Sequence, residues 1–167
     1  DRIAERERGS FRRESRFQGS AAKLSLPNGD LWLLKPETFM NLSGQAVAAL
    51  ASYYKIEPKE ILIAHDELDL PPGGVKLKFG GGLGAHNGLK SIAASLGTQA
   101  FWRLRLGIGH PRDNAQSEKE VIDFVLHAPR VEEQRAIDEA MDRVFDVWPQ
   151  IVASEMEAAM LKLHTKA

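Results

Sequence analysis

The chain has 167 residues, a formal net charge of −1 and no cysteine, which excludes disulfides, thiolate metal sites and a cysteine nucleophile. Hydrophobic residues make up 43% and charged residues 27% of the sequence, as in ordinary globular proteins. No apolar run approaches the ~18 residues of a membrane-spanning helix, and the charged first residues do not resemble a signal peptide. We therefore expect a single domain over residues 1–167, located in the reducing cytoplasm and not in a membrane.

Predicted strands and helices alternate through most of the chain, and helices follow. In chain order, the sequence predicts a helix end over 2–8, strands over 22–26 and 31–34, a helix over 42–54, strands over 61–64 and 75–79, a helix over 87–96, a strand over 103–108, and helices over 118–127, 130–147 and 149–164. The Asn28-Gly29 dipeptide predicts a hairpin, and the wholly apolar segment 61–64 is typical of a strand buried on both faces. This order predicts an α/β fold, a single-domain sandwich with a mixed, twisted central β-sheet flanked by α-helices.

The small net charge hides an uneven distribution. Residues 73–112 contain six Lys/Arg and no Asp/Glu, whereas residues 113–167 contain six Lys/Arg and twelve Asp/Glu. Ten of the 14 glycines also lie between Gly73 and Gly109. Because glycine allows close approach to the backbone and Lys/Arg attracts anions, residues 73–112 suit a phosphate-bearing ligand. A twisted strand, loop and helix with solvated lysines explains the same composition equally well.

The glycine-rich segment 80–91 does not match the common nucleotide-binding motifs. Asn87 stands where a dinucleotide fingerprint needs its third glycine, and Leu89 interrupts the Gly-Lys-Ser of a nucleotide phosphate loop. The polar segment 65–69 lacks the spacing of a metal site, since consecutive residues of an extended chain point to opposite faces. We expect neither a metal nor a cofactor.

Three segments carry polar side chains suited to chemistry: 38–41 before a helix, 65–69 after a predicted strand, and 86–88 at the start of a helix. In open α/β sheets, ligands bind at the carboxyl ends of strands and at helix N-termini. An aspartate such as Asp66 can orient an imidazole during general-base catalysis. An asparagine amide can donate a hydrogen bond to a developing oxyanion.

Each of these side chains also has a purely structural explanation. Asn41 and Asn87 are placed to cap helices, and Asp66 is placed to close a turn. Phe39 offers a flat face to a base or ribose, but an isolated phenylalanine is more often part of a core. His86 is equally explained as a loop histidine whose hydrogen bonds are satisfied.

Four segments, in order and in register, closely resemble bacterial peptidyl-tRNA hydrolases across nearly the whole chain. They are Phe39-Met40-Asn41-Leu42-Ser43-Gly44, the segment from His65 through Gly73, the glycine-rich run through His86-Asn87-Gly88-Leu89-Lys90, and the segment from Arg103 through Pro111. The resemblance implies a monomeric α/β hydrolase that needs no metal. Such enzymes cleave the ester between a peptide and the terminal ribose of tRNA, which recycles tRNA during translation.

The resemblance also implies roles for individual residues. Asp66 would orient the catalytic imidazole, and His86 would belong to the same site. Asn41 and Asn87 would bind the substrate near the ester, with Phe39 beside the terminal nucleotide.

Two basic residues, Lys78 and Arg105, match positions that resemble the family's clamp for the tRNA 5′-phosphate. The acceptor stem would be recognised by its shape and phosphates rather than by its sequence. A non-catalytic RNA-binding relative with the same fold is the alternative function. It would need the basic residues but not Asp66 together with both asparagines.

The sequence departs from the family at its start, where nothing matches the usual first strand, its Gly-Leu-Gly-Asn-Pro-Gly loop and the general-base histidine. None of the five histidines occupies the position of that base. We therefore expect an N-terminal segment of about 25 residues to be absent. We also expect this chain alone to be poorly stable and to hydrolyse peptidyl-tRNA very slowly or not at all.

His86 is the alternative base, and His65 is a poorer one because it diverges from Asp66 in an extended segment. Ala85 replaces a glycine that is usual before His-Asn-Gly.

Overall fold

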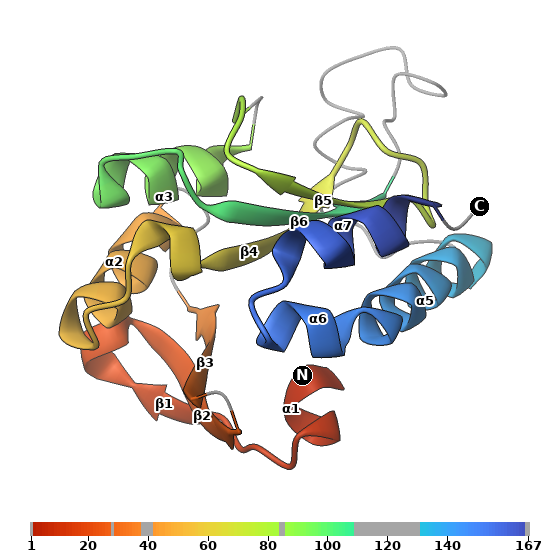
Figure 1. Cartoon of the computed structure of the whole chain (residues 1–167). Helices are drawn as coiled ribbons and strands as arrows, with labels where there is room; N and C mark the ends of the chain where they lie inside the picture. The colour runs from red at the N-terminus through yellow and green to blue at the C-terminus, as the bar shows by residue number, and fades with distance from the viewer. Residues whose placement is uncertain (1, 28, 38–41, 84–85, 109–130, 166–167) are drawn as a thin grey trace. The chain divides into compact units, whose positions relative to one another are not determined.

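The computed structural model of the chain describes residues 2–27, 29–37, 42–83, 86–108 and 131–165 (Figure 1). The chain divides into two compact units. The first contains Asp1–Ile61 and Gly80–Phe101, and the second contains Leu62–Phe79 and Trp102–Ala167. The single-domain interpretation stays a prediction. Among the helices in the described ranges, none combines the length and the hydropathy that crossing a membrane requires.

The first unit contains an antiparallel sheet in the order β1-β2-β3. Its strands are β1 (Arg12–Glu14), β2 (Gly19–Leu26) and β3 (Gly29–Pro36). The predicted hairpin is confirmed, but Leu26 pairs directly with Gly29, so the loop lies one residue earlier than the Asn-Gly dipeptide indicates. Gly29 has a φ of 128°, a backbone conformation that favours glycine.

Helices α1 (Arg2–Arg6), α2 (Ser43–Tyr53) and α3 (Asn87–Leu96) also belong to the first unit, as do single 3-10 turns at Ser15–Phe17 and Pro58–Glu60. The core of this unit forms where α2 meets the sheet. Phe17, Ala21 and Leu50 are buried there, and Trp32 stacks on Tyr54 with 4.0 Å between ring centroids. This aromatic packing holds α2 against β2 and β3.

The second unit contains a mixed sheet in the order β4-β6-β5. Strands β4 (Leu62–Glu67) and β6 (Trp102–Gly107) are parallel, and β5 (Val75–Phe79) is antiparallel to β6. The predicted α/β class and mixed sheet are therefore confirmed. The prediction that the apolar segment 61–64 is buried on both faces is wrong: Ala64 is exposed, and among the described strands β4 has a partner on one side only.

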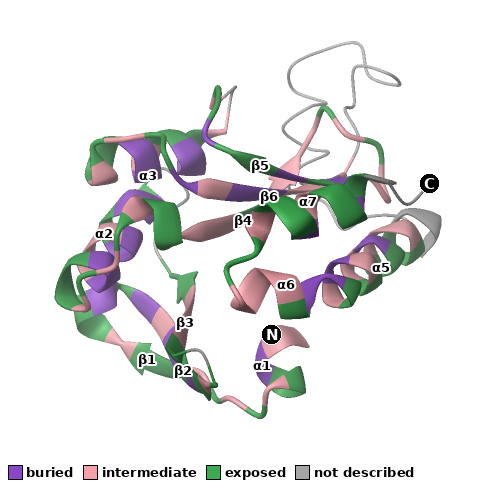
Figure 2. Ribbon diagram, viewed as in Figure 1, coloured by how far each residue is buried: buried purple, intermediate pink, exposed green. Residues whose placement is uncertain are grey.

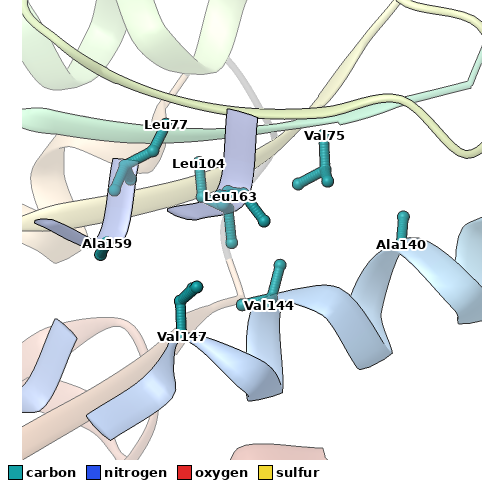
Figure 3. Close-up of a cluster of buried hydrophobic side chains, with 8 residues drawn as sticks. All are labelled: Val75, Leu77, Leu104, Ala140, Val144, Val147, Ala159 and Leu163. Carbon is teal, nitrogen blue, oxygen red and sulfur yellow. The ribbon is translucent and has the colours of Figure 1, made fainter. Parts of the chain in front are cut away.

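Helices α5 (Val131–Asp146), α6 (Trp148–Val152) and α7 (Met156–Thr165) pack against one face of this sheet. Figure 3 shows their shared core. It consists of Val75, Leu77, Leu104, Ala140, Val144, Val147, Ala159 and Leu163. Leu77 and Leu163 are each 1% exposed, so each contributes roughly 1.5–3 kcal/mol through burial.

The C-terminal helices differ in detail from their predicted ranges. The predicted helix over 149–164 is two helices, because α6 ends at Val152 and α7 begins at Met156. Pro149 lies in the first turn of α6, where the missing backbone N–H costs nothing. The amphipathic pattern of α5 is visible as alternating buried and exposed segments (Figure 2). The predicted helix over 118–127 lies outside the described residues.

Candidate active site

Phe39 and Asn41 lie outside the described residues, and the other predicted site residues fall into two groups. His86 and Asn87 belong to the first unit. Asp66, Lys78 and Arg105 belong to the second unit. The geometry of each group is defined within its own unit.

The start of α3 shows that His86, and not Asn87, caps this helix. Nδ1 of His86 accepts a hydrogen bond from the backbone N–H of Leu89 at 3.1 Å. Asn87 is the first helical residue and is exposed, so its amide is available to a ligand. The cap also fixes the tautomer of His86. With Nδ1 accepting and the proton on Nε2, the neutral ring has no acceptor to spare for a general base.

Asp66 is the penultimate residue of β4, whereas the sequence predicts that the strand ends before the polar segment 65–69. The strand register pairs Asp66 with Leu106, so the carboxylate lies on the sheet face that also carries Leu104. Its side chain is half-buried. Asp66 therefore does lie at the carboxyl end of a parallel strand, where ligands bind in α/β sheets.

His65 points to the opposite face and is buried, with 7% exposure. Arg103 Nε donates to His65 Nε2 at 3.4 Å, so the ring proton is on Nδ1, which donates to the Asp66 carbonyl oxygen at 2.9 Å. Burial and the charge of Arg105 lower the pKa of Arg103. Both ring nitrogens of His65 are engaged in these hydrogen bonds, and its ring diverges from the Asp66 side chain as expected along a strand.

The polar face of the second sheet gathers four cations. In the strand register, Lys76 lies beside Arg105 and Lys78 lies beside Arg103. All four side chains therefore project from the sheet face on the other side from Leu77. Lys78 and Arg105 are diagonal neighbours on adjacent strands, a position from which long side chains can reach one another. The structure thus brings together the two residues that match the phosphate clamp.

One charged residue of this face, Glu67, was missed by the sequence analysis. Its Oε1 accepts a hydrogen bond from Arg105 Nε at 2.9 Å, and its Oε2 accepts one from the Asp69 backbone N–H at 3.4 Å. Burial opposes ionisation of Glu67, but the hydrogen bonds from Arg105 and Asp69 outweigh it and hold the pKa of this carboxyl below its ordinary value. No local signal reveals the pair, since it depends on β4 lying beside β6.

A pocket of about 320 Å³ lies elsewhere in the second unit. Lys76, Arg143 and His164 contribute its nitrogen-bearing side chains. His164 Nε2 accepts a hydrogen bond from the backbone N–H of Leu77 at 3.0 Å, which fastens the end of α7 to β5. Within the described residues, no group of three or more His, Asp and Glu is placed to hold a metal ion.

The four motif segments belong to a known protein family. The sequence model of the family described as peptidyl-tRNA hydrolase matches residues 1–167. The chain belongs to the peptidyl-tRNA hydrolase family. The resemblance seen in the four motifs is therefore confirmed, and with it the hydrolase class.

Individual relatives agree with this assignment. The peptidyl-tRNA hydrolase of Nitrosomonas europaea is 55% identical over 166 residues, which cover 99% of this chain and 83% of that protein. The peptidyl-tRNA hydrolase of Neisseria meningitidis serogroup C is 52% identical, covering 99% and 84%. The crystal structure of peptidyl-tRNA hydrolase from Acinetobacter baumannii superposes with a TM-score of 0.91 at 36% identity and covers 98% of this chain and 81% of that one. The α/β fold predicted from the sequence is that of the family.

Proposed function

We propose that this protein hydrolyses the ester bond between the peptide and the terminal ribose of peptidyl-tRNA, and so recycles tRNA as a cytoplasmic monomer. Membership of the family along all 167 residues is the observation that carries the proposal. The position of Asp66 at the carboxyl end of β4 supports the chemistry, since that is where reactive groups gather in α/β sheets.

In the proposed mechanism, Asp66 orients the imidazole of a histidine that acts as general base. The base removes a proton from water as the water oxygen attacks the ester carbonyl carbon. The bond between that carbon and the ribose oxygen then breaks, and the protonated base gives its proton to the ribose oxygen, which releases tRNA with a free hydroxyl and a peptide carboxylic acid that ionises in solvent. Asn41 and Asn87 bind the substrate near the ester, where an amide N–H stabilises the developing oxyanion. Phe39 packs beside the terminal nucleotide, and His86 orders the loop that carries Asn87. No step uses a metal.

The hydrogen bonds of the described histidines weigh against their acting as the base. Both ring nitrogens of His65 are hydrogen-bonded, Nδ1 of His86 accepts from Leu89, and Nε2 of His164 accepts from Leu77. We therefore keep Asp66 as the orienting residue without assigning the base to any of these three.

Lys78 and Arg105 bind the 5′-phosphate at the end of the tRNA acceptor stem. Their neighbouring positions on one sheet face support this role, as does the absence of acidic residues from 73–112. A phosphate is recognised well by a planar guanidinium with a nearby ammonium group. Shape and phosphate contacts, and not base identity, then select the stem.

The substitution Asp66→Asn tests the proposed role of Asp66. Without the carboxylate the imidazole loses its orientation and the stabilisation of its charged form, so turnover should fall by about 10²- to 10⁴-fold. RNA affinity should change by less than about twofold, because the amide is nearly the same size and makes no phosphate contact. The matched control is Asp138→Asn on α5, where an exposed carboxylate accepts a hydrogen bond from Gln134 of the same helix. Unchanged turnover in Asp66→Asn would contradict the role.

A further inference from the structure

We infer that Glu67 is a positioning residue that holds the guanidinium of Arg105 in place for a phosphate group of the RNA. This inference rests on the proposed contact between Arg105 and the tRNA 5′-phosphate. Glu67 lies within the motif from His65 through Gly73, but the resemblance gives it no role. The inference assigns it a geometric role instead of a direct contact with the substrate.

The sheet register makes Glu67 the natural partner of Arg105. Arg105 pairs with His65, and Glu67 pairs with Gly107, so Glu67 and Arg105 are diagonal neighbours on the polar face. Gly107 carries no side chain, and a Cβ there would lie 2.2 Å from the Pro71 carbonyl oxygen, so the loop at 70–71 packs directly against this end of β6. The two side chains are only 16% and 21% exposed, so solvent screens their attraction less than that of a fully exposed pair.

Glu67 is itself held in place from a second side. The Asp69 backbone N–H donates to its Oε2, and the Ile108 backbone N–H donates to its carbonyl oxygen. The carboxylate therefore joins Arg105 to the rigid end of β4. A carboxylate that is fixed at both oxygens restricts its cationic partner more than a freely rotating one does.

The guanidinium nitrogen that binds Glu67 determines which nitrogens of Arg105 are available to a ligand. Glu67 binds Arg105 through Nε, the nitrogen nearest the chain. Among the described residues, Arg105 has no other hydrogen bond, so both terminal nitrogens remain available to bind two oxygens of a phosphate. The exposed pair between Arg13 and Glu37 differs, because Arg13 binds through a terminal nitrogen, Nη1.

A carboxylate beside an arginine also repels a phosphate, so charge and positioning must be separated. Glu67→Asp keeps the charge but shortens the side chain by one methylene, which withdraws the oxygen from Arg105 Nε. Glu67→Gln removes the charge and the acceptor for the Asp69 N–H, but it keeps one oxygen within reach of Arg105 Nε. If Glu67 positions Arg105, the Asp variant should lose recognition of the RNA phosphate and the Gln variant should keep it. If Glu67 acts only through its charge, the outcome is the reverse.

The experiment measures the affinity of the natural protein for two RNA hairpins that differ only in a 5′-phosphate or a 5′-hydroxyl. The ratio of the two dissociation constants reports recognition of the phosphate. We expect Glu67→Asp and Glu67→Ala to lower this ratio by about three- to tenfold, because Arg105 must then be ordered on binding. Glu67→Gln should keep the ratio within about twofold of the wild type.

Two further variants identify which claim fails. Arg105→Ala should abolish the preference for the 5′-phosphate, and adding Glu67→Ala to it should have no further effect on the ratio. If Arg105→Ala leaves the preference unchanged, the proposed phosphate contact of Arg105 is wrong. If Arg105→Ala abolishes the preference but Glu67→Asp and Glu67→Ala retain it, only the positioning role of Glu67 is wrong.

A matched control excludes general damage to the fold. Glu57→Ala removes an exposed ion pair with Lys59 and one half of the capping box at Pro58–Glu60, both in the other unit, and should leave the ratio unchanged. Thermal unfolding of every variant confirms that the folded protein is being measured. If the ratio of dissociation constants falls in folded Glu67→Gln as far as it falls in Glu67→Asp, the positioning role of Glu67 is wrong.

Discussion

The backbone N–H of Gly44 donates a hydrogen bond to Ser91 Oγ at 2.8 Å, which joins the first turn of α2 to α3. A Cβ at Gly44 would lie 2.1 Å from the carbonyl oxygen of Ser91, so glycine is required for this close approach. Gly44 ends the motif that begins at Phe39, and Ser91 follows the motif at 86–90. The contact therefore joins, inside one unit, the helices that follow two of the four family motifs.

The substitution Gly44→Ala should destabilise the protein. The added methyl group meets backbone atoms that can move only if α2 and α3 separate, and overpacking of this kind costs about 1–3 kcal/mol. Urea denaturation measures the change in the free energy of unfolding. Gly82→Ala is the control, since among the described residues beyond its chain neighbours nothing lies within 4 Å of a Cβ at that position. Equal stabilities of the two variants would show that the helices are not closely packed at Gly44.

Two leucines on α7 test the core of the second unit. Leu163 is 1% exposed and Leu161 is 68% exposed. Leu163→Ala should lower the free energy of unfolding by about 2–5 kcal/mol because it leaves a cavity against the sheet. Leu161→Ala should change it by less than about 0.5 kcal/mol. A similar loss in both variants would contradict the packing of α7 shown in Figure 3.

The hydrogen bond from Leu77 to His164 predicts a pH dependence. Burial, and then the charges of Lys76 and Arg143, lower the pKa of His164 below its ordinary value of 6.5. The unfolded chain therefore binds the proton more readily, so the stabilisation is complete above that value and is lost as the pH falls through the lower folded-state pKa. Since His164 is an exposed residue, we expect an effect below about 1 kcal/mol.

NMR titration of the His164 ring checks this prediction directly. The measured pKa should lie below 6.5 in the wild type and rise toward it in Lys76→Ala, which removes one of the two nearby positive charges. A wild-type pKa at or above 6.5, or no change in Lys76→Ala, would disagree with the environment described here.

Salt dependence tests the phosphate role of Lys78. Each phosphate contact releases counterions, so Lys78→Ala should weaken RNA binding and lower the slope of log K against log salt concentration by about 1. Lys59→Ala is the control, because Lys59 is exposed and pairs with Glu57 in the other unit. An equal change of slope in both variants would mean that Lys78 acts only through the overall charge of the protein.

Several elements were predictable from the sequence because their signals are local. The alternation from Val75 to Phe79 matches β5, and the predicted range 87–96 matches α3. The end of β4 was not predictable in this way. His65, Asp66 and Glu67 carry no apolar periodicity, and they extend as a strand only because β6 pairs with them.

The same distinction holds for the candidate site. The resemblance to the family identifies Asp66, Asn87, Lys78 and Arg105 without any structure. The partner of Arg105 requires the strand order β4-β6-β5, in which strands far apart in sequence become neighbours. The sequence does not decide between His86 and Asn87 as the cap of α3. The two residues are adjacent, and either side chain can accept a hydrogen bond from a free N–H in the first turn.

Release of a labelled peptide from peptidyl-tRNA by the natural protein, in the presence of a metal chelator, tests the central claim most directly. We predict that peptide carboxylate and intact tRNA with a free 3′-terminal ribose appear together in equal amounts, and that Asp66→Asn suppresses both. Tight binding of the substrate without release of peptide would contradict the hydrolase and favour a non-catalytic RNA-binding protein.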